Sequence, residues 1–304
     1  MSADNPRHGP ASFLAGGGAV GALCRAKSWT ETSLGTPQSW PQSLRTVVRI
    51  VLSSRYQMWM GWGPDLAFFY NDAYRPTLGV KHEWALGASA REVWREIWPD
   101  IGPRIERVLS SGEATWDEGL LLFLERSGYP EETYHTFSYS PLADDTDQVV
   151  GMLCVVTEET ERIIAARRLA HVRELASEVT RNNTRADVLK ASQHQLNQAL
   201  KDLPFTLLYL FDETGNAALA MRSGFEGEHA MAPLVIRPGS AAEPWPVQEL
   251  LKCRGMVTVD DLPTRFAGLP RGAWDKPPRE AILDRKSTRL NSSHPVSSRM
   301  PSSA

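Results

Sequence analysis

Stretches of alternating or continuous apolar residues between positions 56 and 157 predict five β-strands. They occupy residues 56–62, 66–70, 116–124, 133–139 and 149–157. Helical patterns fill the gap after the second strand, whereas turns separate the last three. Two strands, several short helices and three more strands predict an antiparallel sheet with helices on one face, an α+β fold. Because residues 149–156 are uniformly apolar, we expect the last strand to be central and covered on both faces.

A helix precedes the first strand. Pro41 can occupy its first turn, where the missing N–H costs nothing, with Ser39 or Trp40 as the cap. One apolar stripe indicates that this helix covers the sheet. The stripe consists of Leu44, Val47, Val48, Val51 and Leu52.

More helices are expected between the second and third strands. Asn71 and Asp72 should cap a helix that begins at Ala73, because short polar side chains accept hydrogen bonds from the first N–H groups. Short helical pieces are expected at 83–86 and 90–97. A longer helix at 101–109 should end near Gly112, which can adopt a left-handed conformation.

Residues 158–203 have the pattern of two helices. An apolar stripe in the first helix repeats with steps of four and three, as in the seam of a two-stranded coiled coil. Its members are Ala165, Leu169, Val172, Ala176 and Val179. We therefore expect a parallel dimer over 159–179. The alternative is an amphipathic helix that folds back on the next domain, which suits the second helix, capped by Thr184 and Asp187, better.

A new pattern begins at residue 203 and predicts a second domain. Strands are expected at 205–212, 217–222 and 256–260, and a helix is expected at 245–252. At the other end of the chain, residues 1–27 carry no clear element and are interpreted as a flexible leader. A dinucleotide site needs a buried strand before its Gly-x-Gly-x-x-Gly pattern and a helix after it. The pattern at 16–21 is preceded only by residues 11–14 and followed by turn-forming sequence at 29–41, so we discard it.

Length and charge limit the possible functions. A chain of 304 residues has room for about two domains. The net charge of −3 favours neither nucleic acid nor an anionic membrane as a partner. Cys24, Cys154 and Cys253 lie too far apart to suggest a disulfide framework or a zinc site. No apolar run reaches membrane-spanning length and no signal peptide is evident, so we expect a cytoplasmic protein.

Several short motifs together resemble one known family. They lie at 34–44, 62–66, 70–74 (Tyr-Asn-Asp-Ala-Tyr), 128–133 and 137–141, and Thr157–Thr160 resembles the closing junction. In this order and spacing, residues 28–160 resemble the N-terminal PAS sensor domain of bacterial hybrid sensor histidine kinases. The resemblance implies a sensory domain that passes its signal through the following helical linker, 161–202.

Residues 203–283 resemble the first part of a GAF domain. The resemblance rests on segments 205–212, 257–262 and 269–278, with Gly224 and Trp245-Pro246. GAF sheets need further strands, so we expect a domain that is cut at Leu283. Residues 284–304 resemble a translated sequencing adapter followed by Ser/Pro/Arg-rich sequence, and we interpret them as a disordered, non-native tail.

The chain lacks the motifs of a catalytic domain, so its status as an enzyme stays uncertain. His171 lies on a helix but has neither the acidic neighbour nor the proline of a phospho-acceptor site. There is no phosphate-binding loop, nucleophile elbow or metal-ligand spacing. If the resemblance holds for the parent protein, that protein is a histidine kinase acting with ATP.

With no catalytic motif found, ligand binding is the remaining function to consider, because PAS domains can hold a small molecule between the sheet and the helices. Candidate lining residues are Trp59, Phe69, Tyr74, Trp98, Phe137, Met152 and Cys154. The same residues can equally fill a core. The cofactor is unknown: the cysteine motif of flavin photochemistry is absent, and His82 and His135 have no context that indicates haem.

The sequence therefore predicts the PAS–GAF input region of a two-component sensor histidine kinase. It should act as a homodimer with a possible small-molecule ligand. A kinase core and a response regulator receiver are its expected downstream partners. One alternative is the same input region on a diguanylate cyclase or a PP2C-type phosphatase. The other is a stand-alone small-ligand-binding module.

Overall fold

The structure is a computed structural model that describes residues 12–182, 184–240, 243–253 and 255–286. It divides into two compact units, Met1–Ala165 and Ala166–Ala304, with the boundary inside helix α6 (Thr160–Arg181). Residues 1–11 of the expected leader and the expected tail from residue 287 onward lie outside the described residues. Within the described part, no helix is long and apolar enough to cross a membrane.

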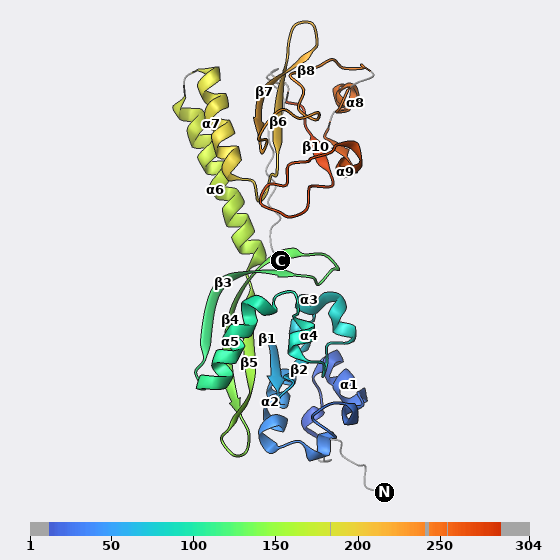
Figure 1. Ribbon diagram of the computed structural model, residues 1–304, viewed down its shortest axis with the longest axis vertical. Coiled ribbons are helices and arrows are strands. Elements are labelled where there is room, and N and C mark those ends of the chain that lie inside the picture. Colours follow the sequence, from blue (N-terminus) through green and yellow to red (C-terminus); the bar gives the residue numbers. More distant parts are fainter. Residues whose placement is uncertain (1–11, 183, 241–242, 254, 287–304) are drawn as a thin grey trace, which may run out of the picture. The chain divides into compact units, whose positions relative to one another are not determined.

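The first unit contains an antiparallel five-stranded sheet in the order β2-β1-β5-β4-β3 (Figure 1). Its strands are β1 (Gln57–Trp62), β2 (Ala67–Tyr70), β3 (Thr115–Leu124), β4 (Glu131–Ala143) and β5 (Val149–Glu158). All five expected strands are confirmed, and β5 is central. The expectation that β5 is covered on both faces holds only in part. Met152, Cys154 and Val156 are buried, whereas Leu153 and Val155, on the opposite face, are only half-buried by the described residues.

The helices between β2 and β3 cover one face of this sheet (Figure 1). They are η4 (Asp72–Tyr74), α3 (Arg75–Leu78), η5 (Gly79–Glu83), α4 (Ala90–Val93) and α5 (Trp98–Ser111). Asn71 Oδ1 accepts a hydrogen bond from Tyr74 N at 3.2 Å, which confirms this cap. Helix α5 ends at Gly112 with φ 69°, as predicted. The short helix expected at 83–86 instead ends at residue 83.

Residues 12–53, which we call the N-terminal cover, pack on the opposite face of β1 and β2. The cover contains η1 (Ser12–Leu14), α1 (Gly18–Ala26), η2 (Trp29–Glu31), η3 (Pro37–Ser39) and α2 (Gln42–Ser53). The prediction that residues 1–27 carry no clear element is therefore wrong, because α1 lies within them. Aromatic packing explains the order: Trp29 stacks on Phe69 with ring centroids 5.0 Å apart, and Trp40 meets Phe69 edge-on. The predicted stripe of α2 does face the core.

Two aspartates that lie outside the cover cap its two α-helices, α1 and α2. Asp72 accepts hydrogen bonds from Ala19 N at 2.9 Å and Val20 N at 2.7 Å, at the start of α1. Asp145 accepts from Gln42 N at 3.0 Å and Ser43 N at 2.8 Å, at the start of α2. The predicted cap of α2 by Ser39 or Trp40 is therefore wrong, because a carboxylate distant in sequence occupies that position.

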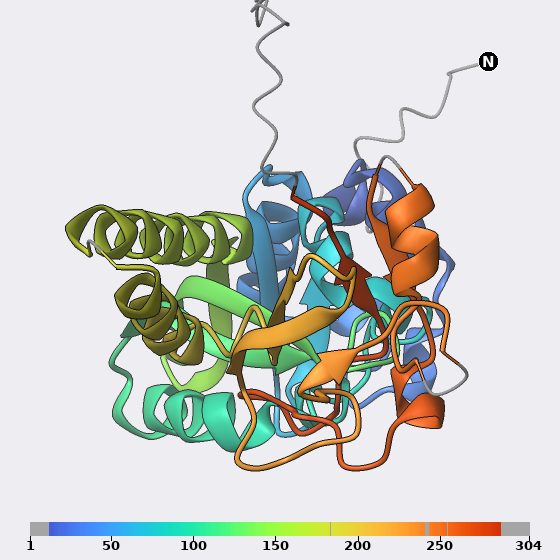
Figure 2. The same cartoon turned by 90° about the horizontal axis from the view of Figure 1, so that it is seen from above.

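The second unit combines two helices with small sheets. Helix α7 (Arg185–Gln198) lies beside α6 in both views (Figures 1 and 2) and packs against β7. The strands are β6 (Thr206–Phe211), β7 (Ala217–Ser223) and β8 (Val235–Ile236) in one sheet, with β9 (Val257–Val259) and β10 (Ala281–Leu283) as a separate pair. Helices α8 (Val247–Lys252) and α9 (Leu262–Arg265) complete the unit. The three strands and the helix expected after residue 203 are confirmed.

The helices of this unit are fixed by local polar contacts. Thr184 accepts a hydrogen bond from Asp187 N at 3.2 Å, which confirms the predicted capping residue. Asp202 accepts from Arg167 Nε and Arg168 Nε, each at 2.8 Å. Because Asp202 follows α7 and the arginines lie on α6, these ion pairs hold the two helices together at one end.

Candidate functional site

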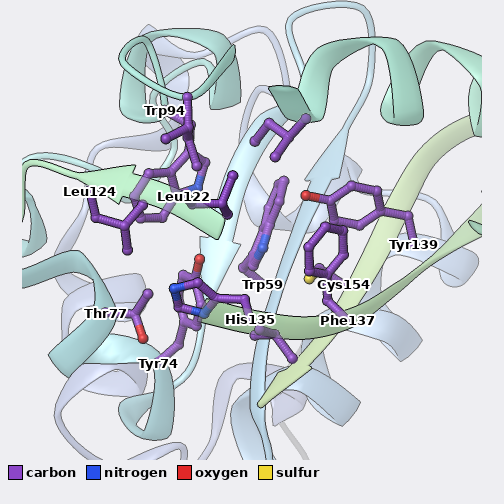
Figure 3. A pocket seen from close by; sticks show the side chains of 13 residues that line it. Trp59, Tyr74, Thr77, Trp94, Leu122, Leu124, His135, Phe137, Tyr139 and Cys154 are labelled. Atoms are coloured by element: carbon purple, nitrogen blue, oxygen red, sulfur yellow. The ribbon is translucent and has the colours of Figure 1, made fainter. Parts of the chain in front are cut away.

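A small cavity lies between the sheet and the helices of the first unit (Figure 3). The space open to the centre of a water-sized sphere is about 20 Å³, enough for a water molecule. Thirteen side chains line it. They are Trp59, Tyr74, Thr77, Trp94, Ile97, Ile101, Leu122, Leu124, His135, Phe137, Tyr139, Cys154 and Val156. None carries an acidic, lysine or arginine group, and the titratable residues of the wall are His135, Tyr74, Tyr139 and Cys154.

Four of the seven predicted cavity residues line this space: Trp59, Tyr74, Phe137 and Cys154. The other three lie elsewhere. Phe69 pairs with Met60 on the opposite face of the hairpin and stacks on Trp29 of the N-terminal cover.

Trp98 and Met152 also lie outside the cavity wall. Trp98 begins α5 at the rim of the unit, where the Arg91 guanidinium lies 5.3 Å from its ring. Met152 is fully buried beside Gly61 of β1, nearer the start of β5 than the cavity residues Cys154 and Val156. Both side chains therefore contribute to packing around the site and not to its wall.

The sequence reasoning missed the polar side of the cavity. His135 and Tyr139 share the inward face of β4 with Phe137, because side chains alternate along a strand. This alternation was available in the sequence and selects them together with Phe137. Trp94, which directly follows α4, and Thr77 of α3 had no such signal.

His135 is held in one tautomer by its neighbour. The Thr133 hydroxyl donates its hydrogen to Leu122 O at 2.9 Å, so it can only accept from His135 Nε2, 3.0 Å away. Nε2 therefore carries the hydrogen and Nδ1 is left as an acceptor. Burial lowers the pKa of His135 to about 4, against the opposing effect of Glu158, and the imidazole is neutral at pH 7.

The other titratable wall groups are also neutral. Burial raises the pKa of Tyr74 and of Tyr139 well above the ordinary range, and it raises the pKa of the Cys154 thiol in the same way. A nucleophilic cysteine needs a lowered pKa and an electropositive setting. The cavity is therefore suited to holding a neutral molecule and not to thiolate chemistry.

The cavity wall continues directly into the start of α6. His135 is the cross-strand partner of Glu158, the last residue of β5. Arg126 donates to both Glu158 oxygens, at 2.9 and 3.1 Å, and to Glu131 at 3.1 Å. Burial raises the pKa of Glu158, but the hydrogen bonds from Arg126 and Thr160 outweigh it and the net shift is downward. An ion pair thus fixes the point where the sheet becomes the helix.

Further contacts attach the first turn of α6 to β4. Thr160 Oγ1 accepts from Tyr134 N at 3.0 Å and donates to Glu158 at 2.9 Å. Glu159 accepts from the Thr136 hydroxyl at 2.8 Å. A shift of β4 would therefore be transmitted to the base of α6.

The predicted seam residues lie on one exposed side of α6. Leu169, Val172 and Val179 are 48%, 63% and 46% exposed, and Ala165 and Ala176 are exposed as well. The half-buried residues of this helix, among them Arg167 and Leu175, lie on another side. In the described part of a single chain, this apolar stripe is therefore exposed to solvent.

Comparison with known proteins places the first unit. Residues 57–163 match the family model described as PAS fold. No curated protein matches the chain. Similar solved structures include an RNA-binding light-oxygen-voltage receptor, at 18% identity, covering 45% of this chain and 38% of that chain, with a TM-score of 0.33. The chain thus spans well under half the length of that receptor.

Two further similar structures come from named bacteria. One is the PAS domain of BvgS from Bordetella pertussis, at 18% identity over 44% of this chain and 99% of that chain, with a TM-score of 0.30. The other is a sensory box sensor histidine kinase from Vibrio cholerae, at 13% identity over 38% of this chain and 89% of that chain, with a TM-score of 0.27.

Proposed function

We propose that the PAS domain at residues 57–163 is the sensory input module of a cytoplasmic two-component sensor histidine kinase. One observation carries the sensory part of the proposal. His135 in the cavity wall is the cross-strand partner of Glu158, where the sheet passes into α6. A molecule that alters the wall therefore acts on a strand that is bonded to the base of the linker.

The route of the signal follows from the contacts at this junction. Displacement of β4 moves Tyr134 and Thr136, which bind the first turn of α6, and disturbs the ion pair between Arg126 and Glu158. In a two-state element, a ligand shifts the population by its difference in affinity for the two states. The junction supplies such an element, with α6 as the part that moves.

Dimerisation through α6 is the second part of the proposal. Its exposed stripe of Ala165, Leu169, Val172, Ala176 and Val179 has coiled-coil spacing. Burial of this stripe against the same stripe of a second copy removes apolar surface from water. A change of twist at Glu158 would then reach both copies together.

Substitution of the seam tests this part. Val172→Asp and Val179→Asp should each raise the dimer dissociation constant at least tenfold, because an unpaired carboxylate would be buried in the interface. Ala170→Asp is the matched control, since residue 170 is exposed outside the stripe. Sedimentation equilibrium of the full chain measures the effect. Unchanged association of both valine variants would contradict the seam.

The identity of the output domain is also part of the proposal. Residues 203–283 retain the element order that resembles the start of a GAF domain, and the family match ends at residue 163. A diguanylate cyclase, a PP2C-type phosphatase or no output at all are the alternatives. The genomic sequence beyond the codon for Leu283 decides among them. A histidine-bearing helix and an ATP lid in a continuing frame support the kinase.

A further inference from the structure

Trp94 presents an unsatisfied hydrogen-bond donor at the cavity wall. Its side chain is 1% exposed, and its Nε1 has no hydrogen-bond partner among the described residues. Figure 3 shows the indole nitrogen on the side toward Leu122, another residue of the wall. A buried N–H without an acceptor destabilises the fold, so an acceptor inside the cavity would relieve this cost.

His135 presents the complementary group. Its Nε2 hydrogen is directed at Thr133, which leaves Nδ1 as a neutral acceptor. The wall therefore offers one nitrogen donor and one nitrogen acceptor, beside the hydroxyls of Thr77, Tyr74 and Tyr139 and the Cys154 thiol. Trp59, Phe137 and Tyr139 supply flat surfaces, with Trp59 and Tyr139 edge-on at a centroid distance of 5.7 Å.

We infer that the cavity binds a small, planar, uncharged molecule that accepts a hydrogen bond from Trp94 Nε1 and donates one to His135 Nδ1. Azoles and primary amides have this pairing. A charged ligand is disfavoured because the wall offers no opposite charge to compensate for its desolvation. The inference rests on the proposed sensory function and adds the chemical class of the signal to it.

The size of the cavity links binding to signalling. The cavity leaves about 20 Å³ for the centre of a water-sized sphere, which is enough for one water molecule. A five-membered ring is larger, so it enters only if side chains of the wall move. Interiors are close-packed, and such a movement is passed on to the strands that carry the wall. The strand that carries His135 is β4, which binds the first turn of α6.

Pyrazole and 1-methylpyrazole are matched probes, because the second lacks only the N–H donor. The full chain is labelled with ¹⁵N, and the Trp94 indole resonance is identified by its loss in Trp94→Phe. Pyrazole should shift this resonance saturably and bind at least fivefold more tightly than 1-methylpyrazole. His135→Leu should abolish the preference, whereas His135→Gln, which keeps an acceptor, should retain part of it.

Two results would overturn the inference. One is a Trp94 resonance that pyrazole leaves unmoved up to its solubility. The other is an equal preference for pyrazole in the wild type and in His135→Leu. If His135→Leu does not fold, the wild type decides: at least fivefold weaker binding of 1-methylpyrazole, read from the saturation of the indole shift, supports the inference, and equal binding of the two probes overturns it. Sedimentation of the seam variants tests the linker independently of the cavity. A negative result with pyrazole would therefore remove the proposed ligand class and leave the proposed sensory function standing.

Discussion

At the scale of single residues, two neighbours in one loop cap two different helices. Asn71 caps η4 within its own loop, whereas the adjacent Asp72 caps α1, more than fifty positions earlier in the chain. Gly18 makes this approach possible: a Cβ there would lie 1.8 Å from Asp72 Oδ2, and its φ is +58°. The glycine-rich pattern at 16–21 thus accommodates a carboxylate of its own chain.

Removal of this cap should weaken the cover. Asp72→Ala is expected to destabilise the first unit by about 1 kcal/mol, since two N–H groups of α1 lose their acceptor. Urea unfolding measures the loss, with Asp65→Ala as the control at an exposed loop position. An equal effect of both substitutions would show that Asp72 contributes nothing specific to the start of α1.

Protonation of His135 should give the stability of the first unit a distinct pH dependence. Its pKa is lowered from 6.5 to about 4 by burial. As the pH falls below 6.5, the unfolded chain takes up a proton that the folded chain refuses until about pH 4, so stability declines across this window. Between pH 7 and pH 5 the loss from this residue is about 2 kcal/mol.

Comparison of His135→Gln with the wild type isolates this contribution. The variant should lose about 2 kcal/mol less between pH 7 and pH 5 in urea unfolding. His194→Gln, an exposed histidine on α7, serves as the control. A pH dependence that is the same in all three proteins would mean that His135 already titrates normally in the folded state.

Residue identity alone predicted only part of the site. Trp59, Tyr74, Phe137 and Cys154 were found because they are aromatic or soft residues on predicted elements. Phe69 was misplaced because the facing of β2 depends on its register with β1, where Trp59 pairs with Tyr70 and not with Phe69. Register across a hairpin is a tertiary property, and a shift by one residue exchanges the two faces.

At the scale of elements, longer segments were predictable and their ends were not. β4 runs to Ala143, past the expected end at residue 139, although it contains Pro141. β3 pairs with β4 only as far as Tyr139, so Pro141 lies where β4 has a single neighbouring strand. The elements missed in the second unit, β8, α9 and β10, have two to four residues each, too few for a periodic signal.

The pairing of α6 with the end of α7 depends on one carboxylate. The side chain of Asp202 is 10% exposed and binds both Arg167 and Arg168. Burial raises the pKa of Asp202, but the arginine hydrogen bonds outweigh this and lower it overall. Asp202→Asn should therefore destabilise the second unit by about 2 kcal/mol. Thermal unfolding measures this, with Glu174→Gln as the exposed control on α6; equal melting temperatures would contradict the role of Asp202.

At the scale of the molecule, the two compact units should respond separately. Hydrogen exchange followed by mass spectrometry distinguishes them. Lowering the pH from 7 to 5 should reduce protection in peptides of β4 and β5, whereas Asp202→Asn should reduce it in α6 beyond Ala165 and in α7. Loss of protection throughout the chain in either experiment would show that the two units unfold as one.

The tryptophans are divided unequally between these units. Of the ten in the chain, only Trp245 and Trp274 lie outside the first unit, and α6 and α7 contain none. Trp59 and Trp94 form part of the cavity wall. The intrinsic fluorescence of the protein is therefore dominated by the first unit, and an occupied cavity changes its emission directly, whereas the linker is reported only through Trp274, whose Nε1 donates to Lys201 O at 2.8 Å.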